Sequence, residues 1–199
     1  MQLIVATRNP HKTREIQRIL GPAFTVSDLS AHPEIADVHE TGKSFQENAM
    51  LKALVASRHL PGFIVADDSG LEVDALGGAP GIFSARYGGE NATDQQNIDK
   101  LLSELARSGA RPNQPARFRC VIALARQGEL LETFEGIIEG TIIDRVRGSH
   151  GFGYDPIFVP RGFEHTFAEL SPHVKDTISH RAKAIRAFAA KISTMTSRG

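Results

Sequence analysis

The sequence predicts an α/β protein built as a single domain. Short apolar runs typical of strands alternate, in the first half of the chain, with longer segments whose apolar residues recur at helical spacing. Residues 116–134 have instead the alternating pattern of two strands joined by a turn. With 199 residues the chain is long enough to bury one sizeable core, so we expect helices packed on a sheet within one domain.

Composition excludes several classes of partner. Lys and Arg together number 23, as do Asp and Glu, so no overall electric field favours nucleic acid or a membrane surface. Cys120 is the single cysteine, which rules out an intrachain disulfide and fits a reducing compartment. No apolar run approaches the roughly 20 residues of a membrane span, and the N-terminus lacks the pattern of an export signal. We therefore expect a cytoplasmic protein.

The first predicted elements are a strand and a helix near the N-terminus. Residues 3–6 are apolar enough for a buried strand. Asn9 followed by Pro10 is a typical helix start, with an N-cap residue and a proline in the first turn. Gly21 and Pro22 would end this helix.

The segment between this strand and this helix is a candidate phosphate site. A strand that runs into a helix N-terminus presents free backbone N–H groups and the positive end of the helix dipole, which suits an anion. Lys12 lies in the first helical turn, where a cation is unfavourable unless an anion offsets it, although such lysines are also common on solvated surfaces. The candidate residues are Thr7, Arg8, Asn9, Pro10, His11 and Lys12.

A second helix is predicted over residues 45–59. Ser44 and Glu47 have the spacing of a capping box at its start. Its buried face would consist of Phe45, Ala49, Ala53 and Ala56. Glu40 stands just before this helix with no capping role, which makes it a candidate metal ligand.

The predicted strand at residues 63–66 leads into Asp67-Asp68-Ser69-Gly70. Successive residues of a strand point to opposite faces, so only one of the two carboxylates can face a given site. A buried carboxylate is costly unless it is paired or coordinates a cation, and Mg2+ prefers carboxylate and phosphate oxygens. The simpler alternative is that both Asp residues only begin a turn at Ser69-Gly70.

The middle of the chain is predicted to be structural. Asp94 would cap a helix that ends before residues 108–112. Its apolar residues, Ile98, Leu101, Leu102 and Leu105, recur at helical spacing and indicate core. Gln127-Gly128 would turn a long hairpin, and residues 137–143 would extend the sheet.

Residues 151–156 form a loop with three glycines nearby, two aromatic side chains and a carboxylate, just before a predicted strand at 157–159. Such a loop offers faces on which a flat ring can stack and an acceptor for an N–H on its edge. Its candidate residues are Phe152, Gly153, Tyr154 and Asp155. The alternative is that the aromatic side chains fold into the core.

A cluster of potential cations lies near the C-terminus. Thr177 or Ser179 would cap a final helix, and Lys175, His180 and Arg181 would then crowd its positive end, which again calls for an anion. Two helix starts with lysines, two candidate carboxylate ligands and an aromatic loop together predict a site for a nucleoside polyphosphate and Mg2+.

These motifs make the chain resemble the inosine triphosphate pyrophosphatase family, the dITP/XTP pyrophosphatases. The matching segments are Ala6–Asn9, Glu40–Gly42, Glu47–Ala49, Ala66–Gly70, Gly78–Gly81, Ser84–Tyr87, Gly151–Pro156 and Ile178–Arg181. The resemblance implies a homodimer and an α/β fold over residues 1–199, with a long mixed β-sheet and flanking helices forming two lobes around a central cleft. It also implies Mg2+-dependent hydrolysis of ITP, dITP and XTP to the monophosphate and pyrophosphate, which would cleanse the nucleotide pool.

The resemblance also assigns roles to individual residues. Asp68 would be the proton acceptor and a Mg2+ ligand, and Glu40 the other ligand. The segment from Thr7 to Lys12 would bind the triphosphate, and Phe152 to Asp155 the base. The remaining substrate contacts would come from Ser69, Lys175, His180 and Arg181. Asp67 is left as a support for the site.

Two other functions are compatible with parts of the pattern. One is a non-catalytic nucleotide or RNA binder using Lys12, Arg117, Arg119 and Lys175, although such a binder would not need the carboxylates of Glu40 and Asp68. The other is a pyrophosphatase of related architecture that acts on pyrimidine or standard nucleotides.

Overall fold

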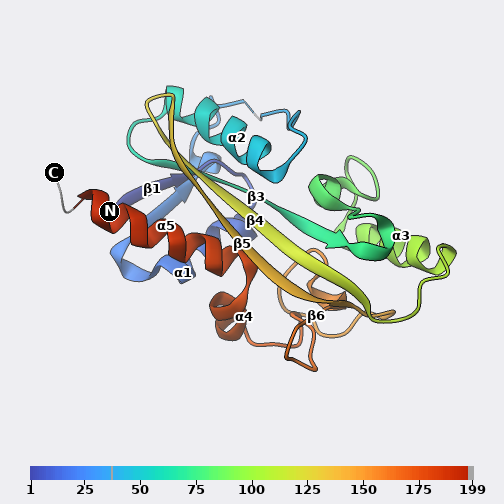
Figure 1. Ribbon diagram of the computed structural model, residues 1–199. Coiled ribbons are helices and arrows are strands. Elements are labelled where there is room, and N and C mark those ends of the chain that lie inside the picture. Colours follow the sequence, from blue (N-terminus) through green and yellow to red (C-terminus); the bar gives the residue numbers. More distant parts are fainter. Residues whose placement is uncertain (37, 197–199) are drawn as a thin grey trace. The chain divides into compact units, whose positions relative to one another are not determined.

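The computed structural model describes residues 1–36 and 38–196, and these residues form an α/β fold on one six-stranded sheet (Figure 1). The strands are β1 (Gln2–Val5), β2 (Thr25–Asp28), β3 (Ile64–Val73), β4 (Gln114–Arg126), β5 (Glu129–Ile142) and β6 (Phe158–Pro160), in the order β2-β1-β3-β4-β5-β6. β1 pairs in parallel with β2 and β3, and β5 pairs antiparallel with β6, so the sheet is mixed. The predicted α/β class with a long mixed sheet is confirmed.

The helices are α1 (Pro10–Leu20), α2 (Phe45–His59), α3 (Asp94–Arg107), α4 (Pro172–Ile178) and α5 (His180–Thr196). None of the helices in the described ranges is both long and apolar enough to cross a membrane. Residue 37 and residues 197–199, which belong to the predicted 1–199 domain, lie outside the described residues.

The chain divides into two compact units. One consists of Met1–Asp68, Cys120–Gly136 and His180–Gly199, and the other of Ser69–Arg119 and Ile137–Ser179. β3, β4 and β5 each contribute residues to both units. The predicted arrangement of two lobes around a cleft stays a prediction, and each unit is described by itself below.

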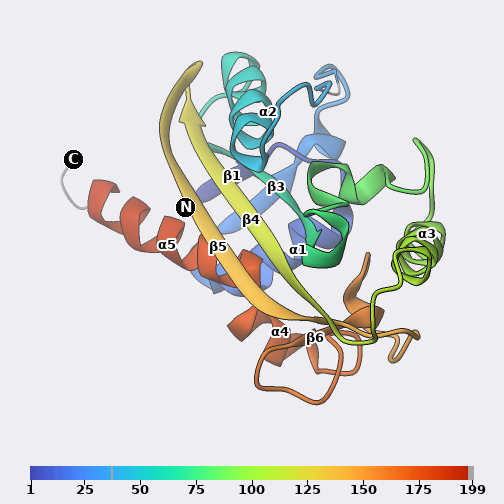
Figure 2. The same cartoon turned by 45° about the vertical axis from the view of Figure 1, so that its right-hand side comes forward.

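In the first unit, helices cover both faces of the strands. α1 and α5 lie on one face and α2 lies on the other, as Figures 1 and 2 both show. Ile16 of α1 and Phe188 of α5 share a buried cluster with Val65 of β3, and Ala49 and Ala53 of α2 are fully buried. Burial of these apolar side chains stabilises the unit and fixes where the polar residues of β3 must point.

In the second unit, α3 packs on the remaining parts of the long strands. Leu101 of α3 is fully buried in a cluster that includes Leu71 of β3 and three phenylalanine rings. The rings are Phe118, Phe158 and Phe167, and the centroids of the first two lie 4.7 Å apart in an edge-on arrangement. The apolar residues of α3 that were predicted to lie in the core belong to this cluster or pack against it.

Local signals placed several boundaries correctly. Asn9 caps α1 and Pro10 is its first residue, while Ser44 caps α2 by accepting a hydrogen bond from the backbone N–H of Glu47. Gln127 and Gly128 have φ angles of 54° and 80°, the left-handed values that a tight hairpin turn of this kind requires.

Two local predictions are wrong. β3 runs without interruption through Ser69 and Gly70, so no turn forms there, because Leu71 and Val73 keep the strand buried to its end. Thr93, not Asp94, caps α3, in a capping box with Gln96. The predicted final helix is α5, and a short helix that was not predicted, α4, precedes it.

The additional helix α4 changes the place of one of the predicted cations. Thr177 lies inside α4, which Ser171 caps, so Thr177 does not cap the final helix, whereas Ser179 directly precedes α5, at the position predicted for its cap. Lys175 lies in the last turn of α4, whereas His180 and Arg181 begin α5. Lys175 therefore does not share the helix N-terminus to which the sequence assigned it.

Candidate functional site

Asp67 and Asp68 point to opposite faces of β3, as the alternation of strand side chains predicts. Asp67 contacts side chains of α1, β4 and α5, whereas Asp68 contacts a side chain of α2. Both residues belong to the first unit and both are buried, with 1% and 6% of their surface exposed. The two faces of this strand are therefore chemically different places.

Asp67 lies in a network of charges that balance. Lys12 Nζ lies 2.5 Å from Asp67 Oδ1, and Arg181 Nε donates to Asp67 Oδ2 at 2.8 Å. The thiol of Cys120 donates to the same oxygen at 3.1 Å. Arg181 also forms a buried ion pair with Glu15. The two carboxylates and two cations joined by these contacts have a formal sum of zero.

The electrostatics of this face agree with the geometry. Burial by itself raises the pKa of Asp67, but Arg181 and Lys12 hold that pKa well below its usual value, so the carboxylate stays ionised. Burial and the neighbouring Asp67 raise the pKa of the Cys120 thiol well above its usual value, so the thiol stays a protonated donor. We conclude that Asp67 is a saturated structural carboxylate that holds Lys12 and Arg181 in place.

Asp68 lies in a different kind of cluster, in which one cation serves two carboxylates. Lys52 Nζ donates to Asp68 Oδ1 and to Glu40 Oε1, each at 2.8 Å, and to the backbone oxygen of Asp67 at 2.9 Å. The second carboxylate oxygen, Asp68 Oδ2, is buried and accepts no hydrogen bond from any described residue. The three side chains joined here have a formal sum of −1.

The pKa values of this cluster depend on burial and on the neighbouring charges. Burial raises the pKa of Asp68, and Glu40 raises it further, while Lys52 and Lys12 lower it, and the net shift is upward. Burial lowers the pKa of Lys52, but Asp68 and Glu40 outweigh burial and raise it. A carboxylate with a raised pKa and an unused oxygen is a candidate for binding a cation or accepting a proton.

Glu40 and Asp68 suit Mg2+ in their chemistry. Both offer carboxylate oxygens, both contact the same ammonium group, and Asp68 Oδ2 is an unused buried acceptor. Within residues 1–36 and 38–196, no group of three or more His, Cys, Asp and Glu residues is arranged to hold a metal by itself. Mg2+ commonly binds one or two carboxylates and completes its shell with water and substrate phosphates, so a pair of carboxylates fits this ion.

Of the predicted phosphate segment, the structure brings Lys12 into contact with Asp67. Asn9 Oδ1 accepts hydrogen bonds from the backbone N–H groups of His11, at 2.9 Å, and Lys12, at 3.3 Å, and Thr7 Oγ1 accepts from the N–H of Asn9. Arg8 donates to backbone oxygens of residues 29–35, including Ile35 at 2.5 Å. Arg8 therefore fixes a neighbouring loop, while Pro10 and His11 are exposed at the start of α1.

The aromatic loop lies in the second unit, and its two rings have different surroundings. Tyr154 is 3% exposed, belongs to the core cluster and donates its hydroxyl to the backbone oxygen of Ser84 at 2.9 Å. Phe152 is half-buried, with Lys175 Nζ 4.9 Å from its ring centroid. The alternative that the aromatic residues fold into the core thus holds for Tyr154, while Phe152 keeps part of its face exposed.

The carboxylate of the loop is already engaged. Asp155 Oδ2 accepts from the backbone N–H of Phe152 at 2.9 Å and from Lys175 Nζ at 2.5 Å. The N–H of Gly153 donates to Asp94 Oδ2 at 2.6 Å. The second unit therefore brings Phe152, Asp155 and Lys175 together, as predicted residues of one site should be.

The other predicted contacts are dispersed over the fold. Ser69 is half-buried in β3, in the second unit. His180 is buried at the first position of α5, and Arg181 next to it is held by Asp67 and Glu15. The binding role of these residues stays a prediction.

Sequence reasoning missed Lys52 and Glu15. Lys52 lies four residues after Asn48 and three after Ala49, on the buried stripe of α2. A lysine on a mostly apolar stripe indicates that a residue of opposite charge lies close to it in the folded protein. Glu15 offers no comparable signal, because its partner Arg181 is 166 residues away in the sequence.

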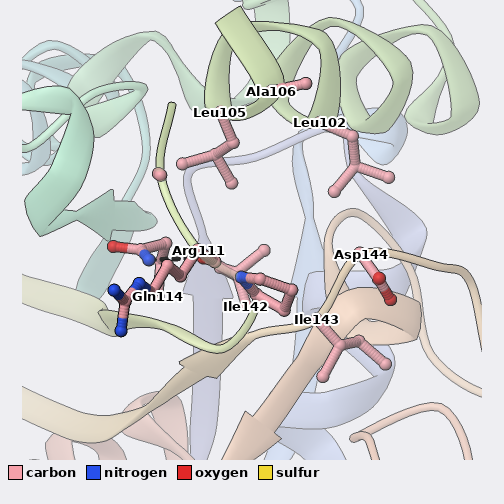
Figure 3. Close-up of a pocket in the computed structure, with 10 residues that line it drawn as sticks. Leu102, Leu105, Ala106, Arg111, Gln114, Ile142, Ile143 and Asp144 are labelled. Atoms are coloured by element: carbon pink, nitrogen blue, oxygen red, sulfur yellow. Dashed lines mark hydrogen bonds between the residues drawn. The ribbon is translucent and has the colours of Figure 1, made fainter. Parts of the chain in front are cut away.

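The second unit also contains a separate pocket, shown in Figure 3. It has a volume of about 200 Å³ and apolar walls from α3 and the end of β5, with Arg111 and Asp144 at its sides. Nucleotide-sized ligands need pockets of roughly 300–1,000 Å³. None of the predicted site residues lines this pocket, so it is not the candidate nucleotide site.

Comparisons with known proteins place this geometry in context. The model of the Ham1 family matches residues 3–191. The dITP/XTP pyrophosphatase of Geobacter sulfurreducens is 49% identical over 185 residues, which cover 92% of this chain and 92% of that protein. The dITP/XTP pyrophosphatase of Bacillus subtilis is 45% identical over 186 residues, with 93% of each chain covered.

Solved structures agree with these matches. The Ham1 protein of Staphylococcus aureus has a TM-score of 0.85 at 40% identity, over 98% of this chain and 100% of its own. A Ham1 protein from Coxiella burnetii has a TM-score of 0.86 at 37% identity, over 98% of this chain and 99% of its own. At this level of identity the likeness extends beyond the fold.

Proposed function

Since the chain belongs to the Ham1 family, we propose that it hydrolyses non-standard purine nucleoside triphosphates, namely ITP, dITP and XTP, to the monophosphate and pyrophosphate. Membership confirms the resemblance found in the motifs, and the relatives named above are dITP/XTP pyrophosphatases. The observation that carries the proposal is the pair of carboxylates around Lys52, the half-buried Glu40 and the buried Asp68, in which Asp68 Oδ2 has no partner among the described residues.

Mg2+ is the proposed cofactor, with Asp68 and Glu40 as its protein ligands. When bound, the ion would neutralise charge that develops on the phosphate oxygens. Two lysines of the protein would supply the other positive charges of the site. Lys12 forms an ion pair with Asp67, and its ammonium group would hold the phosphate tail. Lys52 pairs with both Glu40 and Asp68 and keeps these two carboxylates at a fixed separation.

The proposed reaction is in-line attack of water on the α-phosphorus, with pyrophosphate as the leaving group. Asp68 would orient that water and take its proton. A general base works best when its pKa lies nearer the working pH than that of an ordinary carboxylate, and burial beside Glu40 raises the pKa of Asp68 in this direction. Asp67, whose pKa is lowered, is unsuited to this role and instead holds Lys12 and Arg181.

Base selection is assigned to the loop of the second unit. Phe152 keeps part of its ring exposed for stacking, and Gly153, Tyr154 and Asp155 shape the loop around it. A pocket that donates to a 6-oxo group leaves its donors unpaired when the 6-amino group of adenine enters, at a cost of about 1–3 kcal/mol for each group. We further propose that the protein is a cytoplasmic homodimer that removes such nucleotides from the pool, without nucleic-acid partners.

An assay with seven substrates tests this proposal. The protein is incubated with ITP, XTP, dITP and the four common triphosphates, each with Mg2+ or with EDTA, and the products are identified. We expect turnover of the first three, only with Mg2+, and release of pyrophosphate. Release of inorganic phosphate would overturn the proposed bond cleavage, and turnover of pyrimidine nucleotides at similar rates would overturn the substrate class.

A further inference from the structure

Asn48 is a buried polar side chain on the apolar stripe of α2. Its exposed fraction is 0%, and its neighbours along the stripe are Phe45, Ala49, Lys52 and Ala53. The amide lies one helical turn from Lys52, so both side chains emerge from the same face of α2. A polar side chain in such a place requires a partner that accounts for it.

The partner is the backbone of the segment that carries Glu40. The N–H of Gly42 donates to Asn48 Oδ1 at 2.8 Å, and because a backbone N–H only donates, the atom of Asn48 that faces Gly42 must be its oxygen. The next N–H, that of Lys43, donates to Glu47 Oε2 at 2.6 Å. Two successive backbone groups are thus held by side chains from the first turns of α2.

Gly42 lies so close to α2 that no larger residue fits. A Cβ at this position would come within 2.6 Å of Asn48 Oδ1, 2.7 Å of Glu47 Cβ and 2.9 Å of the backbone nitrogen of Asn48. The φ angle of Gly42 is not in the left-handed region, so the close approach, not the backbone conformation, requires glycine here. The contact is therefore a tight one between the loop and the helix.

Glu40 stands two residues before this contact, and its carboxylate accepts a hydrogen bond from Lys52 Nζ. The same helix therefore holds this segment at three points: the backbone of Gly42 through Asn48, the backbone of Lys43 through Glu47, and the carboxylate of Glu40 through Lys52. Of the two backbone contacts, the one through Asn48 lies nearer to Glu40 in the sequence.

Asn48 is a costly choice for stability alone. Its second polar atom, Nδ2, is buried and has no hydrogen-bond partner among the described residues. A buried unpaired donor destabilises the folded state, so removing the whole amide recovers part of what the lost hydrogen bond costs. A residue kept only for stability would be apolar here, like Ala49 and Ala53 beside it.

We propose that Asn48 is a positioning residue for Glu40, which it holds at the place where its carboxylate can bind a divalent cation together with Asp68. The inference rests on the proposed function in taking Glu40 as a metal ligand. Side chains that orient a metal ligand typically change metal affinity by about 10- to 100-fold when they are removed.

The test compares Asn48→Ala with Ser57→Ala. Ser57 is also buried on α2 and also accepts a backbone N–H, that of Gly128, but in the hairpin turn and not near Glu40. Mg2+ binding to the substrate-free protein is measured by calorimetry, and the Mg2+ concentration for half-maximal dITP turnover is measured in parallel. We expect Asn48→Ala to weaken both by about 10-fold, and Ser57→Ala to change neither, while the two melting temperatures fall by similar, small amounts.

Gly42→Ala breaks the same contact from the other side and leaves Asn48 in place. We expect it to weaken Mg2+ binding as Asn48→Ala does, and the double variant to add little, because both changes remove one interaction. Variants that lose melting temperature but keep the Mg2+ dependence of the wild type would overturn the inference, since that result is what a purely structural contact produces.

A third measurement separates this inference from the proposed function. Amide hydrogen exchange of residues 40–42 should be faster in Asn48→Ala than in the wild type or in Ser57→Ala. If the wild type turns over fully in EDTA, the metal assignment of the proposed function fails, whereas the positioning of the segment is still decided by exchange. Unchanged exchange at these amides would overturn the inference whatever the metal requirement.

Discussion

The two faces of β3 place adjacent aspartates in opposite electrostatic situations. On the face of α1 and α5, the carboxylates of Asp67 and Glu15 are matched by Lys12 and Arg181, and the pKa of Asp67 falls well below its usual value. On the face of α2, Lys52 forms ion pairs with both Glu40 and Asp68, and burial raises the pKa of Asp68. One network is complete without a ligand and the other is not.

The difference shows how two adjacent residues of one strand can have different roles. Asp67 supports the side chains around it, whereas Asp68 is the candidate for metal binding and proton transfer. A fully paired buried carboxylate stabilises its partners and has nothing left to offer a substrate. A carboxylate with a raised pKa and an unpaired oxygen costs stability and keeps the capacity to bind a cation or a proton. The alternation of the strand makes the separation possible, because neighbouring side chains cannot face the same site.

The largest expected effect is that of Asp68→Asn on turnover. The substitution keeps an acceptor for Lys52 but removes the charge that would bind Mg2+ and accept a proton, so kcat should fall by about 10³-fold. The free energy of unfolding should stay the same or rise, because the wild-type carboxylate is buried with an unpaired oxygen. Steady-state kinetics with dITP and urea denaturation measure the two quantities. A variant that keeps most of its turnover would remove Asp68 from the chemistry.

Asp67→Asn should have its main effect on stability. The change leaves the buried Arg181 and the half-buried Lys12 beside a neutral group, and breaking a buried ion-pair network in this way costs about 3–5 kcal/mol. The matched control is Asp74→Asn, which removes an exposed carboxylate partner of Arg117. This change should lower the free energy of unfolding by less than about 1 kcal/mol. Equal losses in the two variants would show that the Asp67 network is not special.

The depressed pKa of Asp67 adds a pH dependence to this prediction. A carboxylate whose folded pKa is lowered contributes stability that is present above its unfolded pKa of about 4 and is lost as the pH falls through the lower folded pKa. The stability difference between wild type and Asp67→Asn should therefore shrink as unfolding is measured at progressively lower pH, below about pH 4.

Lys52→Met tests the face of β3 that carries Asp68, where removal of a charged side chain should strengthen Mg2+ binding. Removing the cation increases the repulsion between Glu40 and Asp68, so Mg2+ should bind the substrate-free protein more tightly, by on the order of tenfold. Turnover should nevertheless fall, because the carboxylates lose their fixed separation. Calorimetry with Mg2+ checks the first expectation, with Lys100→Met, in which a half-exposed lysine near Glu104 is lost, as the control. Weaker Mg2+ binding in Lys52→Met would contradict the account of this face.

Much of this contrast could be predicted from the sequence. The strand alternation separated Asp67 from Asp68, and the structure confirms this separation. The sequence also singled out Glu40, as a candidate metal ligand, and Lys12, as a candidate phosphate contact, and the structure brings Glu40 near Asp68 and Lys12 to Asp67. The limit was reached where contacts depend on distant parts of the chain. The pairing of Arg181 with Glu15 and Asp67 joins α5 to α1 and β3, and no local pattern encodes it.

Other misses came from competition between local and tertiary signals. Ser69-Gly70 is a strong turn signal, yet burial of Leu71 and Val73 keeps β3 straight through it. Thr177 is a good cap by type, but it lies inside α4, the additional helix that Ser171 caps. In both cases a residue that suits a local role is part of a longer strand or of an additional helix.

The smallest expected effect is that of Cys120→Ala, which removes one donor from the complete network and leaves the ionic ones. The thiol is buried, and its raised pKa keeps it protonated, so it contributes a weak hydrogen bond to Asp67 Oδ2 and no charge. Arg181 still donates to the same oxygen, so the free energy of unfolding should fall by about 1 kcal/mol or less, and kcat should stay within about twofold of the wild type. If Cys120→Ala instead destabilised the protein as much as Asp67→Asn, the thiol would be a principal partner of Asp67, and the charge balance argued for this face would not explain why its carboxylate is ionised and inert.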